Sequence, residues 1–421
     1  MQFSNDYENT LDKGRKGLQV EMSHLGVSAH PGRHQLGELR TTISKGAKHI
    51  ELGWFGSGKG SIGQGKFNPE VHSSEEREAM RQLAKINKVS LSTHASMNIG
   101  SLSGMTQEGF SKTAQENTKH EIDRALGFAA DVAQGGPVVV HVGEFPRPIF
   151  EATKEFNSPD AYFEAIKEEK ETAPILLVDK ETGKIKTLAP RGTKIQVENG
   201  TDEHGFTRFR ETTMAELLEK KKETIIDMDE GKAAVEVYKD INRNELNLAK
   251  GEIGRAIAEA EILKRRAETE SNESIKQMLI QESEHYKKIA SAKKIEILRA
   301  EKQLDNTETI YEYGTRQSAE AIADEAIKAF RLEKEKKLEE HLWIAVENFE
   351  PNSYGSHPKE LRVLIEESRK KMTERLKVEQ NMSESQAKNV AADHIKATFD
   401  IGHANFWRKY FKGKPEDFNK W

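Results

Sequence analysis

Four short hydrophobic runs in this chain each end on a side chain that can bind a metal ion. The runs are residues 90–94, 138–141, 343–347 and 397–400, and they end on His94, His141, Glu347 and Asp400. Imidazole nitrogens and carboxylate oxygens are ligands that zinc and related divalent ions take in proteins. A catalytic site of this kind leaves one position for water, and the ion lowers the pKa of that water toward neutrality. The four residues therefore predict a hydrolytic metal centre.

The expected arrangement has two adjacent sites that share one carboxylate. His94, His141 and Glu347 form a first three-ligand site, and Glu347 bridges to a second site that contains Asp400. His403, three residues further on, reaches another ion or the substrate, so Glu347 and His403 are the candidate catalytic residues. We expect zinc, with manganese or magnesium as alternatives. The alternative for each histidine is a hydrogen-bonded structural role at the end of a strand.

Composition limits the partners and the compartment. Charged residues make up 32% of the 421 residues, but the formal net charge is only -5, so no general affinity for polyanions follows. The chain has no cysteine, which leaves histidine, aspartate and glutamate as the metal ligands. No apolar run reaches the roughly 20 residues that a membrane span requires, and the first residues do not resemble a signal peptide. We therefore predict a cytoplasmic protein without a membrane partner.

The ligands can meet only if the four runs end at one edge of a sheet. From about residue 25 to residue 141, short apolar runs alternate with amphipathic helical stretches, which is typical of βαβ units. We expect strands over residues 25–30 and 47–52 and strands ending at His94 and His141, and helices over residues 35–45, 74–86 and 114–133. This order predicts an α/β fold of the TIM type, a (β/α) barrel whose first half occupies residues 1–150.

A long insertion interrupts the barrel pattern after His141. Residues 151–212 hold apolar segments around a glycine-containing turn at residues 180–184, which predicts a small β-rich insertion with a hairpin. Residues 213–341 lack proline and repeat apolar residues at three- and four-residue spacing, which predicts three helices folded into an antiparallel arm. The arm is a lid, a dimerisation arm of a homo-oligomer, a platform for a protein partner, or a self-packed appendage.

Residues 342–421 resume the barrel pattern with a fifth and a sixth strand. Helices are expected over residues 359–372 and 384–394, between the strands that end at Glu347 and Asp400. A closed barrel of this class has eight strands. We therefore expect a barrel that lacks its last two strands.

Five ordered segments resemble endonuclease IV. They are Thr93-His94-Ala-Ser-Met-Asn-Ile, Val140-His141-Val-Gly143, Val346-Glu347-Asn348, Asp400-Ile-Gly-His403-Ala and the first strand, which ends on Ala29-His30. That family, AP endonuclease family 2, belongs to the xylose isomerase-like TIM barrel superfamily. The resemblance covers residues 25–143 and 343–404 in the same order.

The resemblance implies a DNA repair hydrolase with three zinc ions that cleaves the phosphodiester 5′ to an abasic site. His94 and His141 would bind one ion, Glu347 would bridge to the next, Asp400 would bind the second and His403 the third. Substrate contacts would come from His30, Asn98 and Asn348. Apart from the resemblance, Lys59 and Lys66 in the loop after the second strand are expected to meet a substrate phosphate. The family's remaining ligands, on its last two strands, have no counterpart here, and His-Val-Gly replaces its His-Pro-Gly.

Two rival functions remain open at this point. A sugar isomerase or epimerase of the same superfamily would use Glu347 and a second carboxylate to exchange protons with a carbohydrate bound to one divalent ion. An inactive barrel would act as a scaffold through its helical arm. Among weaker signals, the aromatic residues of 406–411 have helical spacing and favour packing over nucleic-acid binding. His72, Asp202 and His204 have no partner at ligand spacing and are expected at the surface.

Overall fold

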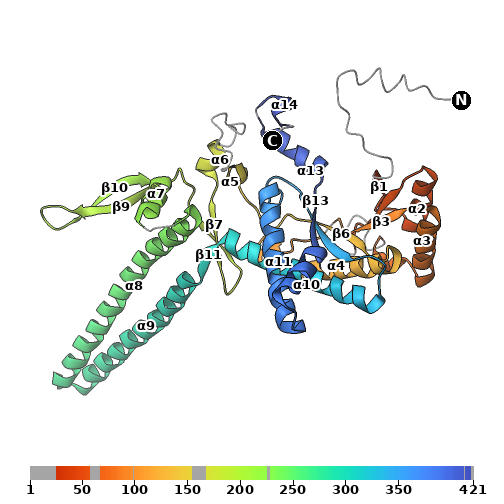
Figure 1. Ribbon diagram of the computed structural model, residues 1–421. Helices are drawn as coiled ribbons and strands as arrows, with labels where there is room; N and C mark the ends of the chain where they lie inside the picture. The colour runs from red at the N-terminus through yellow and green to blue at the C-terminus, as the bar shows by residue number, and fades with distance from the viewer. Residues whose placement is uncertain are drawn as a thin grey trace.

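A six-stranded parallel sheet forms the centre of the computed structural model, which describes residues 25–56, 67–97, 99–153, 167–224, 228–411 and 413–418 (Figure 1). The strands are β1 (Gly26–Ser28), β2 (His49–Leu52), β3 (Ser90–His94), β6 (Gly136–His141), β12 (Leu342–Glu347) and β13 (Ile395–Thr398). They lie side by side in the order of the chain, and every neighbouring pair is parallel. The strands predicted from the apolar runs are thereby confirmed as elements of one sheet.

Each central strand sends alternate side chains to opposite faces of the sheet. On one face Ile50, Val138 and Ile344 are fully buried in the hydrophobic core against the helices. The other face carries the alternate positions, which include His94 and Glu347. Because side chains alternate with a period of two, this register fixes which face the polar strand ends occupy.

Helices follow the strands along the chain, and successive helices pack against one another. The helices are α2 (Gln35–Ser44), α3 (Ser74–Asn87), α4 (Lys112–Val132), α10 (Ile310–Lys336), α11 (Pro358–Gln380) and α12 (Glu384–His394). Contacts join each successive pair in this series. The architecture is a mixed α/β fold with a central parallel sheet. Among the described residues β1 and β13 are the two edges of that sheet, and closure into a barrel stays a prediction.

Local sequence explains where several of these helices begin. Ser73 and Glu76 form a capping box at the start of α3, and Ser383 with Gln386 forms another at the start of α12. Each box satisfies two backbone N–H groups that the first helical turn leaves without a partner. The starts of α3 and α12 can therefore be predicted from the few residues around each capping box.

The predicted hairpin is present in the insertion. Strands β7 (Ile175–Asp179) and β8 (Ile185–Leu188) pair antiparallel around the turn at residues 180–184, and β11 (Thr307–Thr309) pairs with β7 on its other side. Gly183 adopts a φ of +71°, and a Cβ there would come within 2.4 Å of the Phe110 carbonyl oxygen. A second hairpin joins β9 (Lys194–Thr201) to β10 (Thr207–Thr213), followed by α7 (Met214–Thr224).

Two long helices form the arm. Figure 1 shows α8 (Glu230–Thr269) and α9 (Glu273–Asp305) as a hairpin that extends away from the sheet. The two helices are separated at residues 270–272, which agrees with the antiparallel arm predicted from the sequence. The third helix differs from expectation, because α10 packs in the core against α4, α11 and β12. Its small residues, such as Ala323 and Ala326, allow this close approach to the sheet. In the described residues no helix has the length and apolarity of a membrane span.

Glu325 is a buried carboxyl group on α10. Its side chain is inaccessible, and Lys328 Nζ lies 2.9 Å from Glu325 Oε1 while also binding Asp123. Burial, reinforced by Asp123 and opposed by Lys328, raises the pKa of Glu325 from 4.5 to about 8. Between these two pH values the folded protein holds a proton that the unfolded chain releases. The group therefore lowers the stability as the pH rises through that window.

Glu325→Gln is expected to raise the free energy of unfolding by about 1 to 3 kcal/mol at pH 8 and to change it little at pH 5, because glutamine does not titrate. Denaturant unfolding at the two pH values measures the difference. Glu335→Gln, at an exposed position of the same helix, is the control and should have no effect at either pH. An equal effect of Glu325→Gln at both pH values would contradict the raised pKa.

Candidate metal centre

The carboxyl ends of β3, β6 and β12 bring His94, His141 and Glu347 together, as the sequence predicted. Glu347 is the register partner of His141 in the β6–β12 pair, so their side chains leave the same face of the sheet. One donor atom from each of the three residues lies within 4.8 Å of the others. His94 is 4% exposed and Glu347 is 6% exposed. The cluster is thus shielded from bulk water. Charged groups interact more strongly in such a buried site than in water.

The donor atoms of the three side chains converge closely enough to bind one metal ion. Glu347 Oε2 lies 3.0 Å from His141 Nε2 and 3.4 Å from His94 Nε2, yet this buried oxygen makes no hydrogen bond. His94 Nδ1 lies 2.7 Å from the Ala95 carbonyl oxygen, which can only accept, so Nδ1 carries a proton. His94 Nε2 then needs a second proton or a metal ion between it and Glu347. Zinc ligands at about 2.0–2.1 Å in a tetrahedron stand about 3.3 Å apart, which matches these separations.

A second cluster shares Glu347 with Asp400 and His403. Donor atoms of these three residues also lie within 4.8 Å of one another. Asp400 caps α13 (Ile401–Asn405) and accepts hydrogen bonds from the backbone N–H groups of Gly402 and His403 through Oδ1. His403 Nδ1 lies 2.9 Å from the Asn348 carbonyl oxygen and 3.5 Å from Asp400 Oδ2. The structure therefore contains the shared-carboxylate arrangement expected from the strand ends, and both clusters could bind a metal ion.

Electrostatics favour an ionised Glu347. Burial acts to raise the pKa of this carboxyl group, but His141 and His94 outweigh burial and hold the pKa at about 2. Burial also acts to lower the pKa of His94, and Glu347, assisted by Glu51 on β2, raises it overall. A proton and a metal ion therefore compete for the same imidazole nitrogen, as is general for histidine ligands.

Sequence reasoning missed two residues that surround the cluster. Phe349 stacks on His141 with ring centroids 4.6 Å apart and meets His403 edge-on at 4.9 Å. Glu51 occupies the same strand face as His49, in alternation with the buried Ile50. That alternation was the available signal for Glu51. Phe349 had no signal of its own beyond its position two residues after a proposed ligand.

Asn348 orients Asp400 and was expected to contact substrate. It is completely buried, its Nδ2 donates to the Asp400 carbonyl oxygen at 3.0 Å, and its Oδ1 accepts from the Asp400 N–H at 2.8 Å. Both ends of the amide are thus occupied by the backbone of Asp400, and the Asn348 carbonyl also holds His403. Asn348 therefore positions two ligands, as residues behind metal ligands commonly do.

Asn348→Ala is expected to weaken metal binding by about 10- to 100-fold while all five predicted ligands remain, because Asp400 loses both amide hydrogen bonds. Titration with zinc, followed by calorimetry or a competing chelator, measures the affinity. Asn352→Ala, on the same loop, serves as a comparison because its side chain makes no hydrogen bond in the described residues. Equal affinities of the two variants would refute a positioning role for Asn348.

The remaining predicted substrate residues are less well placed or lie outside the described ranges. His30 is exposed in the loop after β1, where its Nδ1 accepts from the Gly32 N–H at 3.0 Å. Lys59, Lys66 and Asn98 lie outside the described residues. In the C-terminal aromatic segment Trp407 is 1% exposed and packs on Ile149 and Phe150, which confirms packing for that side chain.

His72 corrects one expectation. It is 2% exposed and lies beside His34 and Glu76, with which it forms a third cluster of potential ligands. Burial, followed by the charge of His34, lowers the pKa of His72 to about 4. The prediction of a surface residue was wrong because His34 is distant in sequence, and the four-residue spacing from His72 to Glu76 was overlooked.

A fourth cluster, Glu333 with His341 and His394, is explained without an ion. Glu333 Oε1 lies 2.9 Å from His341 Nδ1, and Glu333 Oε2 lies 2.9 Å from His394 Nε2. The same carboxylate accepts the Leu342 N–H at 3.1 Å. These contacts satisfy the carboxylate with hydrogen bonds and ion pairs, so the cluster fits a structural link between α10 and α12.

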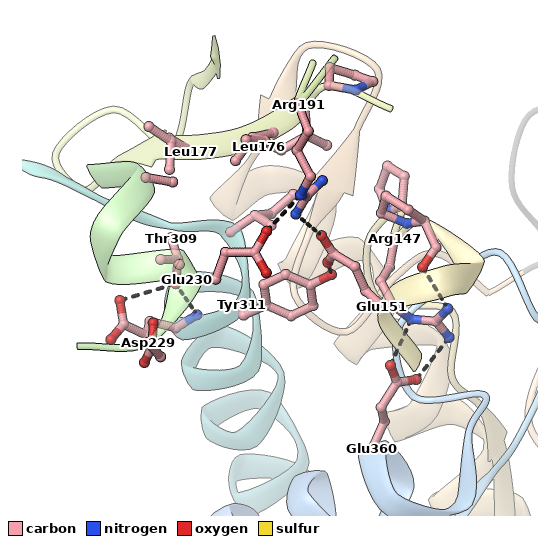
Figure 2. A pocket seen from close by; sticks show the side chains of 18 residues that line it. Arg147, Glu151, Leu176, Leu177, Arg191, Asp229, Glu230, Thr309, Tyr311 and Glu360 are labelled. Carbon is pink, nitrogen blue, oxygen red and sulfur yellow. Dashed lines mark hydrogen bonds and ion pairs between the residues drawn. The ribbon is translucent and has the colours of Figure 1, made fainter. Parts of the chain in front are cut away.

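A cleft of about 540 Å³ lies away from the strand-end ligands, where the insertion meets α10. Figure 2 shows that its charged side chains bind one another. Arg191 contacts Glu230 at 2.6 Å and Glu151 at 3.0 Å, and Tyr311 donates to Glu151. Because these side chains bind one another across the cleft, the cleft fits a structural junction better than a ligand site.

Comparisons with protein-family models, with curated proteins and with solved structures find no match for this chain. Functional inference therefore rests on the residues and their geometry.

Proposed function

We propose that this protein is a metal-dependent hydrolase that cleaves a phosphodiester, with DNA containing an abasic site as its substrate. The observation that supports the proposal most strongly is the pair of clusters that share Glu347 at the carboxyl ends of consecutive parallel strands. Enzymes built on parallel strands with following helices place their catalytic groups at that edge. The ordered motifs around the five ligands add the endonuclease IV-like TIM barrel class and the choice of DNA.

The ligand chemistry fits zinc. Histidine and carboxylate ligands in a buried three-ligand site with spacings of 3.0 and 3.4 Å suit a tetrahedral ion with one open position. A bound divalent ion would supply a water molecule of lowered pKa and would offset negative charge on the phosphoryl oxygens. His94 and His141 would bind the first ion through Nε2, together with Glu347. Asp400 and His403 would add ligands for a neighbouring ion.

The chain's own residues prepare the site before any ion binds. Backbone carbonyl groups of Ala95 and Asn348 fix the Nδ1 proton of His94 and His403. Phe349 holds the plane of the His141 ring by stacking. These contacts reduce the reorganisation that metal binding requires, which is the usual contribution of residues behind metal ligands.

The proposal is tested with zinc-loaded protein and a duplex that contains a single abasic site. We expect a nick on the 5′ side of the abasic residue, abolished by chelation and restored by zinc. An intact duplex of the same sequence is the substrate control, and a panel of keto-sugars tests the isomerase alternative. Turnover of a sugar without nicking would replace the proposal with the isomerase. Bound metal with neither activity, or no bound metal at all, would favour the scaffold.

A further inference from the structure

The cluster of His34, His72 and Glu76 lies outside the strand-end centre and contains a buried imidazole without a hydrogen bond. His72 is 2% exposed, and neither of its ring nitrogens makes a hydrogen bond. Buried polar atoms in folded proteins are nearly always satisfied, and an exception calls for an explanation such as a bound ion. The ring also packs against Phe128 at 5.9 Å, but a phenyl ring would fill that place without the cost of two desolvated nitrogens.

One donor atom from each of His34, His72 and Glu76 lies within 4.8 Å of the other two. Glu76 Oε2 lies 3.5 Å from His72 Nδ1, and Glu76 Oε1 lies 3.3 Å from His34 Nε2. The rings of His34 and His72 have centroids 4.5 Å apart and meet at 72°. Ligands at about 2.0–2.1 Å from a tetrahedral zinc ion stand about 3.3 Å apart. Two histidines and one glutamate form a recognised ligand set for zinc that leaves one position for water.

We propose that His34, His72 and Glu76 bind a divalent transition-metal ion of their own, separate from the strand-end clusters. Zinc is the metal that suits these ligands best. The ion clamps the loop after β1 to the start of α3. His34 precedes α2 and Glu76 lies in the first turn of α3, so the two ligands come from consecutive βα units. Both loops lie at the same edge of the sheet as Glu347. The clamp therefore stabilises the rim beside the strand-end centre.

The side chains around the cluster leave its ligand atoms available and place no unpaired positive charge of Arg77 beside a bound cation. His34 is the residue before α2 but makes no capping hydrogen bond with its side chain. Glu76 is oriented by the capping box, in which its Oε2 accepts the Ser73 N–H at 3.3 Å. The nearby cation Arg77 is neutralised by Asp131 at 2.7 Å. Half of the His34 side chain is exposed, so an ion and its water molecule can enter from solvent.

Metal titration in a background without Glu347, the ligand that the two strand-end clusters share, tests the site at His34, His72 and Glu76. In the Glu347→Gln protein, we expect one equivalent of zinc or cobalt to bind with micromolar or tighter affinity. Adding Glu76→Gln should weaken that binding by about 100-fold while the helix start is kept, because glutamine also serves in a capping box. Adding His34→Ala should have the same effect without disturbing the core, since His34 is half exposed.

His285→Ala is the matched control, because His285 is exposed on α9 and belongs to none of the clusters in the described residues. It should leave the affinity unchanged. Cobalt provides a second readout, since a tetrahedral ion gives a strong visible absorption that Glu76→Gln and His34→Ala should remove. The proposal is overturned if the background protein binds no equivalent below about 100 μM, or if these two variants bind as tightly as the background. Failure here would leave the strand-end centre and its activity untouched.

Discussion

Glu347→Gln is expected to remove metal from both strand-end clusters and to lower phosphodiester hydrolysis by at least about 10³-fold, or roughly 4 kcal/mol of transition-state stabilisation. Glu347 is the one residue that the two clusters share. Its Oε2 faces both imidazoles and has no hydrogen bond that would explain its burial. Glutamine keeps the volume of the side chain but has no charge to offset that of a divalent ion.

Metal content by elemental analysis and the rate of nicking on abasic-site DNA measure the two effects together. The control is Glu350→Gln, an exposed carboxylate three residues further along the same loop, which should keep both metal and rate. Circular dichroism and the unfolding midpoint show whether the fold is preserved. Full metal content and full activity in Glu347→Gln would exclude Glu347 as the shared ligand.

Arg147→Met is expected to destabilise the protein by about 3 to 5 kcal/mol, because it leaves a buried carboxylate without its partner. Arg147 has no exposed side-chain surface, and its Nε lies 2.6 Å from Glu360 Oε1 while Nη2 lies 3.0 Å from Glu360 Oε2. Nη2 also donates to the Ser353 carbonyl oxygen at 3.1 Å. Figure 2 shows Arg147 and Glu360 facing each other at one side of the cleft. The pair ties the loop after β6 to the start of α11.

The loss of stability should grow with pH. Burial raises the pKa of Glu360 although Arg147 opposes that rise, so the pKa of the carboxyl rises further when the arginine is removed. A carboxyl that stays protonated in the folded state contributes less stability as the pH rises above the pKa of the unfolded chain. Denaturant unfolding at pH 5 and pH 8 should therefore show the larger loss at pH 8.

Two further variants test the interpretation. Arg362→Met removes an exposed arginine of α11 that pairs with Glu366 at the surface, and surface pairs of this kind contribute little. Arg147→Met/Glu360→Gln should recover a large part of the lost stability, since it removes the unpaired charge and keeps the cap of α11. An effect of Arg147→Met no larger than that of Arg362→Met would argue against a buried ion pair.

The sequence was sufficient to predict the elements that carry the ligands. Apolar runs of four or five residues predicted β3, β6 and β12 with their carboxyl ends at His94, His141 and Glu347, because the last residue of a run is a local property. Parallel strands then bring such ends to one edge of a sheet. That reasoning also brought Asp400 and His403 to the same place, where the second cluster lies. Closure into a barrel, the hydrolase class and the DNA substrate stay predictions.

The tertiary structure decided which polar residues are buried and which partners they contact there. His72 and Arg147 look like ordinary surface residues in sequence, yet each is buried among groups from distant segments. The same holds for α10, whose helical pattern was clear but whose place in the core depended on packing against α4 and α11. Hydrophobic periodicity and strand-end chemistry act within a few residues and can be read from the chain. The satisfaction of a buried charge or imidazole depends on atoms that only the folded chain brings together.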